Sequence, residues 1–414
     1  MSLHSLLVML RLPLDLVVVV LRYYIFGGLR FRKFNKSLLN CLKLRVYRTS
    51  LQVDMMDGKY LFPYSNRFLI RKIIPFIARE LVKDLPGYGE LYDPNLMWLV
   101  KQEDRKSSDP IIIFSHGGGY FIQTAPLQIK SVLSVYRLLD YEKRRRTSIL
   151  FLDYNLISEG YPFPHQLHQL HKTYSKLVSE KNDNIILMGD SAGGHLSISY
   201  TQFLRTVSAP VVYPLKMVLI SPWVKLSPLP EDLVQGKSWN DNEHYDMIHH
   251  SRFASMLDLR HLIGTSDPFS IICSPGGKTP RTQDDWNCIP LYSDDKHDIF
   301  LILGEDESFR DDVLQWAKYA IDLPWFEKIK YGNLHEFLDE KHYQLIRRGE
   351  QGKVNLSVFI EPHGVHDSML YFEDVIASDV SRKLKSGKLP NVRDYDRAKY
   401  FGIVRLVEFL NSSL

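Results

Sequence analysis

One serine stands in a setting that would make its hydroxyl reactive. The segment around it reads Gly189-Asp190-Ser191-Ala192-Gly193. It follows a short apolar run at 185–189 and precedes a stretch with helical patterning. A G-x-S-x-G turn between a strand and a helix holds the serine hydroxyl above the sheet, and both glycines are needed because side chains would clash there. The sequence therefore predicts that Ser191 is a nucleophile, and a purely structural turn is the alternative.

A second glycine-rich segment offers hydrogen-bond donors for an anion. It reads His116-Gly117-Gly118-Gly119 and follows an apolar run. Consecutive glycines leave backbone N–H groups free to bind the negative oxygen of a tetrahedral intermediate. We expect the N–H groups of Gly117, Gly118 and Ala192 to form this oxyanion hole, while His116 and Gly119 support the loop. Phosphate binding is the alternative, but the lysine and hydroxyl residue of a P-loop do not follow the glycines.

Together the two segments resemble the hormone-sensitive-lipase-like branch of the α/β-hydrolases. A third segment, Asp153-Tyr-Asn-Leu156 followed by Tyr161-Pro-Phe-Pro164, resembles the D-Y-R-L-A-P-E-x-x-F-P motif of that family. The resemblance extends from about residue 110 to the carboxyl terminus. It departs at Asn155, where the family often has arginine, and at 157–160, both in a supporting loop. It implies an α/β-hydrolase fold with a triad in the chain order serine, acid, histidine.

The resemblance also implies the other two members of the triad. The segment GEDESFRDD, which follows the apolar run 298–303, resembles the family pattern E-x-D-x-L-R-D and places Glu307 at the acid position. Asp306 is the alternative acid. The segment EPHGVH follows the last expected strand, and its His366 matches the histidine of the family. His363 is the alternative histidine.

These residues support one mechanism that needs neither a metal nor an organic cofactor. His366 would take the proton of Ser191 as the serine attacks an ester carbonyl, and Glu307 would orient the imidazole and stabilise its charged form. The chain would then be a serine esterase. Three histidines at 165, 168 and 171 share one helical face, but no carboxylates lie between them, so we expect no metal site.

Short apolar runs that alternate with helical segments would position these residues. The expected strands are 96–101, 111–115, 148–154, 185–189, 216–221, 298–303 and 356–360. The expected helices are 128–143, 164–180, 193–206, 310–323 and 395–411. This pattern predicts an α/β fold with a mostly parallel central sheet flanked by helices. Functional residues would lie at the carboxyl ends of the strands.

Two regions interrupt the alternation and are expected to form cap elements. They run from 31 to about 95 and from 223 to 296, and long insertions of this kind commonly become lids. The expected division is therefore an N-terminal segment at 1–30 and a hydrolase domain at 31–414.

The N-terminal segment is strongly apolar but carries charges. Residues 6–26 are long enough to span a membrane, yet Arg11, Asp15 and Arg22 interrupt them. Three interpretations remain open: an uncleaved signal-anchor, a helix lying in the membrane interface, and an ordinary helix packed on the catalytic domain.

Features beyond this segment point to opposite topologies. Four basic residues favour a cytosolic catalytic domain, namely Arg30, Arg32, Lys33 and Lys36. Three N-x-S sequons, at Asn35, Asn355 and Asn411, are typical of glycoproteins and point to a lumenal domain. Topology therefore stays open at the level of sequence.

Composition argues against several classes of protein. The net charge is only +4, from 52 basic and 48 acidic residues, and no aromatic-basic motif is visible, so we expect no nucleic-acid partner. The cysteines Cys41, Cys273 and Cys288 lack metal-ligand spacing. We expect free thiols, and pairing of Cys273 with Cys288 in an oxidising compartment is the alternative.

A narrower resemblance suggests the substrate. The apolar N-terminal segment with RYYIFGG, followed by HGGGY, GDSAGGHLS and GEDE, is similar to the fungal steryl acetyl hydrolases. This resemblance implies an esterase of the endoplasmic-reticulum membrane, with a lumenal catalytic domain, that removes acetyl groups from sterols. The alternatives are a general lipase or carboxylesterase, an arylformamidase, and a non-catalytic receptor on the same fold.

Overall fold

A mostly parallel sheet forms the centre of the computed structural model, which describes residues 1–26, 33–34, 37–208, 210–253, 256–277, 281–324 and 343–414. The strands lie in the order β1-β2-β4-β3-β5-β6-β7-β9-β8. Their bounds are β1 Leu91–Asp93, β2 Leu96–Val100, β3 Ile111–Ser115, β4 Ser148–Leu152, β5 Ile185–Asp190, β6 Lys216–Ile220, β7 Asp298–Gly304, β8 Gln344–Arg347 and β9 Asn355–Glu361. Strands β4, β3, β5, β6, β7 and β9 run parallel, while β1, β2 and β8 add antiparallel edges. The expected α/β class is confirmed.

Helices cover both faces of this sheet. The longer ones are α1 Leu3–Ile25, α2 Leu38–Ser50, α6 Pro126–Leu138, α8 His165–Ser179, α9 Ala192–Leu204, α11 Met256–Ile263, α14 Arg310–Ala320, α17 Val375–Lys385 and α18 Phe401–Ser413. The short ones are α3 Asn66–Phe68, α4 Ile74–Ile77, α5 Arg79–Val82, α7 Tyr141–Arg144, α10 Ser238–Asp241, α12 Asp284–Asn287, α13 Pro290–Ser293 and α16 Ser368–Tyr371. Short 3₁₀ segments lie at η1 Met55–Tyr60, η3 Ile157–Glu159, η4 Pro230–Asp232, η5 His250–Arg252 and η6 Val392–Asp394, and a short π-helical segment lies at η2 Leu69–Ile73.

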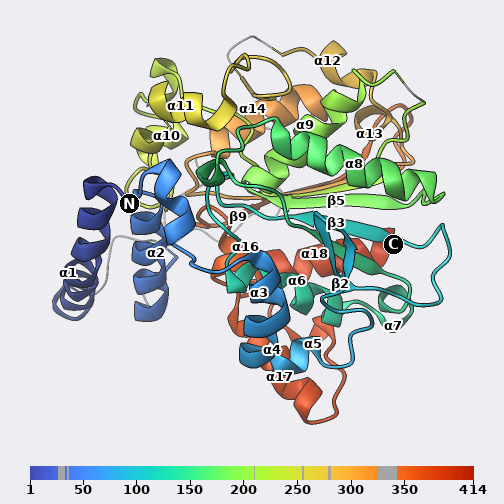
Figure 1. Ribbon diagram of the computed structural model, residues 1–414, viewed down its shortest axis with the longest axis horizontal. Helices are drawn as coiled ribbons and strands as arrows, with labels where there is room; N and C mark the ends of the chain where they lie inside the picture. The colour runs from blue at the N-terminus through green and yellow to red at the C-terminus, as the bar shows by residue number, and fades with distance from the viewer. Residues whose placement is uncertain (27–32, 35–36, 209, 254–255, 278–280, 325–342) are drawn as a thin grey trace.

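Side-chain alternation along the strands builds two apolar cores. Ile111 and Ile113 of β3 face the core shared with α8, α9 and α14, whereas Ile112 and Phe114 face the core shared with α6 and α18. Figure 1 shows these two helical layers above and below the sheet. Because every central strand is buried on both faces, each reads as a continuous apolar run in the sequence.

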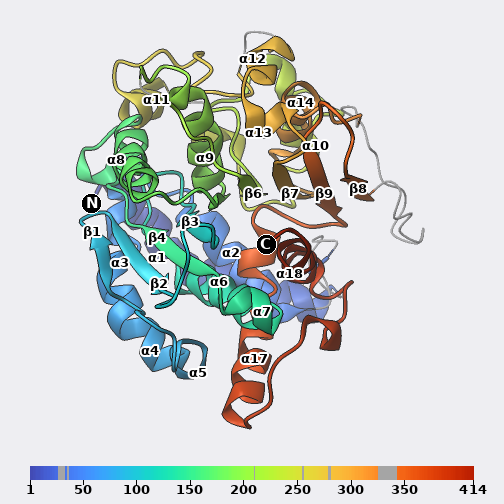
Figure 2. The same ribbon diagram turned by 90° about the vertical axis from the view of Figure 1, so that its right-hand side faces the viewer.

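The expected strands are found within two residues of their predicted bounds, and the differences lie at the edges. Strands β1 and β8 were not expected, because each is short and only partly buried. The expected helix at 128–143 instead begins at Pro126 and ends at Leu138, and α7 follows as a separate turn. Parallel pairing carries the carboxyl ends of β3, β5, β6, β7 and β9 to the same edge of the sheet, as expected for a functional site. Figure 2 shows β6, β7, β9 and β8 side by side in this sheet.

Helix α1 packs beside α2 at the margin of the molecule (Figure 1). By length and composition it is the one helix in the described ranges that could cross a membrane. The basic residues Arg30, Arg32 and Lys36 and the first sequon asparagine, Asn35, lie outside the described residues. Cys41 and Cys273 are buried free thiols and Cys288 is an exposed one, so the structure contains no Cys273–Cys288 disulfide.

Candidate active site

The turn that carries Ser191 has the geometry of a strained elbow. Ser191 follows β5 directly and precedes α9, and its φ of 48° is unusual for a residue with a side chain. A Cβ on Gly189 would lie 2.3 Å from the Gly193 backbone, and a Cβ on Gly193 would lie 1.9 Å from the Ser115 carbonyl oxygen. The backbone therefore requires glycine on both sides of the serine, which is the arrangement that the sequence predicts.

The glycine loop after β3 lies beside this elbow. Gly118, with φ of 106°, and Gly119, with φ of 60°, line the same cavity as Ser191. The Gly117 N–H instead donates to the Asp190 carboxylate, and a Cβ on Gly117 would lie 2.3 Å from Asp190 Oδ2. The Gly117 N–H is thus used in the hydrogen bond to Asp190. Gly118 and Gly119 are the glycines of this loop that border the cavity.

Asp190 joins the elbow to the glycine loop. Besides the bond from Gly117, its Oδ2 accepts a hydrogen bond of 2.6 Å from Gln128 Nε2 on α6. Burial raises its pKa to about 7, against the lowering effect of these hydrogen bonds. The carboxyl group ties three segments together beneath the serine, so its place is structural, as its position in the motif suggests.

His116 braces the glycine loop and carries no charge. Its Nδ1 lies 2.6 Å from the Gly117 carbonyl oxygen, and its ring stacks on Tyr154 with centroids 4.3 Å apart. The Tyr154 hydroxyl donates to the His116 carbonyl oxygen over 2.6 Å. Complete burial lowers the pKa of His116 to about 4, so the ring is neutral.

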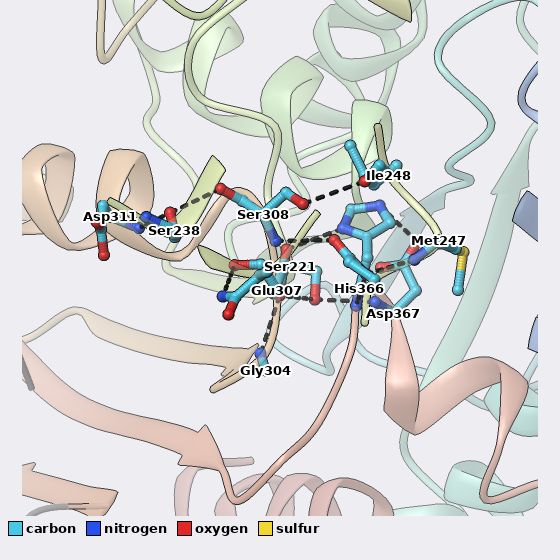
Figure 3. A network of polar contacts seen from close by, with 12 residues as sticks. Ser221, Ser238, Met247, Ile248, Gly304, Glu307, Ser308, Asp311, His366 and Asp367 are labelled. Carbon is cyan, nitrogen blue, oxygen red and sulfur yellow. Dashed lines mark hydrogen bonds and ion pairs between the residues drawn. The ribbon is translucent and has the colours of Figure 1, made fainter. Parts of the chain in front are cut away.

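Glu307 and His366 meet at the ends of β7 and β9. Nδ1 of His366 lies 2.8 Å from Oε1 of Glu307. The other carboxylate oxygen accepts hydrogen bonds from the Ser221 hydroxyl, at 2.8 Å, and from the Gly304 N–H, at 2.9 Å. Figure 3 shows the Glu307 side chain at the centre of these contacts. Every oxygen of this fully buried carboxylate is satisfied, and its orientation toward the imidazole is fixed.

The alternative acid and histidine lie together but apart from this pair. His363 Nδ1 is 3.3 Å from Glu305 and 3.6 Å from Asp306. The Asp306 N–H donates to the Gly364 carbonyl oxygen over 2.8 Å, which joins the two loops. The geometry therefore pairs Asp306 with His363 and Glu307 with His366, and only His366 lines the cavity that holds Ser191.

Two carboxylates that the sequence did not single out also contact His366. Oδ2 of Asp367 lies 3.2 Å from Nε2 of His366, and Oδ1 of Asp246 accepts the His366 backbone N–H over 2.8 Å. The position of Asp367 directly after the histidine was a visible signal. Asp246 gave no signal in the sequence, because it lies in the insertion, 120 residues before His366.

The carboxylates control the charge of the histidine. Burial alone lowers the pKa of His366, but Asp367, Glu307 and Asp246 together raise it to about 10. Burial also raises the pKa of Asp246, to about 6, and that of Asp367 well above its usual range. Oδ1 of Asp367 is buried and makes no hydrogen bond with any described residue.

A largely apolar cavity of about 260 Å³ lies over Ser191 and His366. One wall comes from α2 and from Leu61 and Phe62, which follow η1, and another comes from the insertion between β6 and β7. The apolar side chains around it are Val46, Tyr47, Leu51, Leu61, Phe62, Phe121, Ile122, Trp223, Met247, Ile248, Phe253, Phe309 and Tyr371. A neutral, water-insoluble group suits these walls better than a charged one.

Comparison with known proteins agrees with this geometry. A family model described as steryl acetyl hydrolase matches residues 90–341. A Schizosaccharomyces pombe protein that its name assigns to the steryl acetyl hydrolases, mug81, is 29% identical over 335 residues, which are 76% of this chain and 84% of the relative. Steryl acetyl hydrolase 1 of Saccharomyces cerevisiae is 27% identical over 173 residues, 39% of each chain.

Solved structures share the fold. An esterase of the bacterial hormone-sensitive lipase family superposes with a TM-score of 0.50 at 17% identity, over 90% of this chain and 98% of that one. The family match itself spans more than half of the chain. The protein therefore belongs to the steryl acetyl hydrolase family and is a carboxylic ester hydrolase with the α/β-hydrolase fold.

Proposed function

We propose that the protein removes acetyl groups from steryl acetates at a membrane, with Ser191, His366 and Glu307 as its catalytic triad. The observation that carries the proposal is the apolar cavity lined by both Ser191 and His366, in a chain of this family. The 2.8 Å contact between His366 and Glu307 supports the histidine–acid part of the proposed triad.

Each group would act in a defined order. His366 Nε2 accepts the Ser191 proton as Oγ attacks the acetyl carbonyl, and Glu307 holds the Nδ1–H tautomer and stabilises the imidazolium. The N–H groups of Gly118, Gly119 and Ala192 bind the oxyanion, with Gly119 in the role first expected of Gly117. His366 then protonates the departing sterol oxygen, and a water molecule releases acetate from the serine by the same steps in reverse. No metal and no organic cofactor enters these steps.

The apolar cavity walls favour an ester whose alcohol part is apolar. Aromatic and aliphatic side chains of α2, of the segment after η1 and of the insertion surround the space above Ser191. We propose that the described parts of 31–95 and 223–296 act as the cap that shapes this space. The named relatives supply the acetyl and sterol classes, since 260 Å³ by itself defines only a compact apolar group.

The location follows as part of the proposal. We place the enzyme at the endoplasmic-reticulum membrane with a lumenal catalytic domain, on the resemblance to fungal relatives and on the apolar helix α1. The proposal does not include glycosylation. The amide of Asn355 donates to the Asp295 carbonyl oxygen over 2.6 Å, and Asn411 accepts the Asp140 N–H over 2.9 Å, so both described sequon side chains already serve the fold.

The test compares three esters in detergent solution. Purified wild type and Ser191→Ala are assayed on cholesteryl acetate, on a long-chain cholesteryl ester and on p-nitrophenyl acetate. Serine-dependent release from cholesteryl acetate, well above that from the long-chain ester, is the expected result. Turnover of p-nitrophenyl acetate alone would leave a general esterase. A folded protein without any turnover would overturn the enzyme mechanism and favour a receptor.

A further inference from the structure

The cavity over Ser191 is small for an ester of a large alcohol. Its volume of about 260 Å³ lies below the roughly 300–1,000 Å³ with which protein pockets enclose most of a medium-sized organic ligand. The acetyl group that would be bonded to Ser191 also takes part of this volume. A large alcohol must therefore extend beyond this cavity, and the side chains that it meets there would take part in the choice of substrate.

A second cavity, of about 350 Å³, adjoins the first. Its lining includes Leu51 at the end of α2, and Met247, Ile248 and Phe253 of the insertion between β6 and β7. These four residues also line the cavity over Ser191, so the two cavities are neighbours that share one apolar wall. The part of an alcohol that leaves the first cavity past this wall enters the second.

The rest of the second cavity is polar and basic. The side chains that complete its lining are His4, Arg48, Gln52, His249 and Ser251. Three of them are bases, and no carboxylate of a described residue lines this cavity. The cavity over Ser191 differs, because among the described residues its lining includes Asp367 and no lysine or arginine. The second cavity therefore offers a positive environment that the first does not.

Arg48 is the base of this lining that is always charged. Its Nη1 donates to the backbone carbonyl oxygen of Asp246 over 3.1 Å. Within the described part of the chain, the half-buried guanidinium forms no ion pair, whereas Arg45, one turn earlier on α2, pairs with Asp15. Because a guanidinium carries five N–H donors, Arg48 retains donors for an anion.

The two histidines of the lining are already in contact with protein groups. Nε2 of His249 lies 2.5 Å from Oε1 of Glu243. Nε2 of His4 lies 3.2 Å from the carbonyl oxygen of Gln52. The side chain that would bind an anion in this cavity is therefore Arg48.

We propose that the second cavity binds a carboxylate at the far end of the substrate's alcohol, and that Arg48 selects for this group. The inference rests on the proposed function, because it takes the acetyl ester to lie at Ser191. A carboxylate suits Arg48 better than a hydroxyl does, since the planar guanidinium can donate two parallel hydrogen bonds to its oxygens. The preferred substrate is then the acetate ester of an amphipathic alcohol, with an apolar body and an acidic end.

A pair of esters that differ only at the far end tests the proposal. They are 3β-acetoxychol-5-enoic acid and its primary carboxamide, assayed in detergent solution with wild type, Arg48→Met, Arg48→Lys and Arg137→Met. Arg137 on α6 is the control, because it is also half-buried and donates to a backbone carbonyl oxygen, that of Leu81, but lines neither cavity.

We expect kcat/KM of wild type to be about tenfold or more higher for the acid, because hydrogen bonds to charged groups are the stronger ones. Arg48→Met should remove this preference by raising KM for the acid, whereas Arg48→Lys keeps part of it and Arg137→Met keeps all of it. Arg48→Met also loses the hydrogen bond to Asp246, which affects both esters alike, so the acid-to-amide ratio is the measurement. An equal ratio in wild type and Arg48→Met would overturn the proposal.

A binding measurement separates this proposal from the proposed function. Ser191→Ala is titrated calorimetrically with 3β-hydroxychol-5-enoic acid and with its carboxamide. Tighter binding of the acid, lost in Ser191→Ala/Arg48→Met, would keep the anion site even if wild type hydrolysed no steryl acetate. Hydrolysis of cholesteryl acetate together with equal binding of acid and amide would keep the function and remove the anion site. Displacement of the sterol acid by an equal concentration of free 4-methylpentanoate would show a site for free anions and overturn the link to the substrate.

Discussion

Replacement of Asp367 by asparagine should make the enzyme active at lower pH. His366 must be neutral to accept the serine proton, so activity is lost as pH falls through the pKa of His366. That pKa is raised to about 10, and the Asp367 carboxylate, 3.2 Å from Nε2, contributes most to the rise. Removing this negative charge lowers the pKa of His366, so the imidazole stays neutral down to a lower pH.

The size of the effect follows from the distance between the two groups. An opposite charge within about 4–6 Å shifts a pKa by roughly 1–3. The other carboxylates around His366 stay in place: Glu307 after β7, Asp246 in the insertion and Asp190 at the end of β5. We therefore expect the acid limb of kcat/KM to move down by about 1–3 pH units, and kcat/KM at pH 7 to rise about tenfold or more.

The backbone allows a clean substitution at this position. Asp367 has φ of 51°, which asparagine and glycine adopt more readily than other residues. Asp367→Asn and Asp367→Gly should both fold, and Asp379→Asn on α17 is the control. The assay is the pH profile of kcat/KM for p-nitrophenyl acetate between pH 5 and 10, with Tm measured for each variant. An acid limb that stays at the wild-type pH in both variants would refute the reasoning.

Three further predictions concern the proposed triad and its turn. Ser191→Ala should abolish ester turnover while its Tm stays at the wild-type value by differential scanning fluorimetry; residual serine-independent turnover would contradict the mechanism. Glu307→Gln should lower kcat by about 10³–10⁴-fold because the carboxylate no longer fixes the imidazole, whereas Asp306→Asn should lose far less; equal losses would show that the acid is misassigned. Gly193→Ala should cost about 3 kcal/mol or more of stability, since its Cβ would meet the Ser115 carbonyl oxygen at 1.9 Å; an unchanged denaturant midpoint would show that the turn relaxes.

The residues that carry strong local constraints could be predicted from the sequence. Central strands are buried on both faces, so β3 and β5 read as apolar runs whose bounds are visible. Ser191 and the glycines beside it were recognisable because the turn excludes side chains. The contact of His366 with Glu307 is the geometric finding, and the catalytic role of Glu307 stays a prediction taken from the register of the family pattern.

Other features depend on contacts that a linear pattern does not encode. The N–H of Gly117 and that of Gly118 are alike in the sequence, and only the position of Asp190 directs the first away from the cavity. Asp246 reaches His366 across 120 residues, and no local spacing reports that contact. The edge strand β8 is too short and too exposed to leave a pattern.

The place of Asp246 limits how the insertion can move. Its carboxylate accepts the backbone N–H of Ser308, beside Glu307, and that of His366, each over 2.8 Å. A swing of this segment away from the sheet would release both backbone segments that carry the proposed catalytic acid and base. The insertion between β6 and β7 therefore helps to hold the Glu307 and His366 loops in place. A chimaera in which the insertion of a relative replaced this one would change the rate together with the substrate preference. Opening for bulky esters is left to the opposite wall, which is built by α2 and by Leu61 and Phe62 after η1.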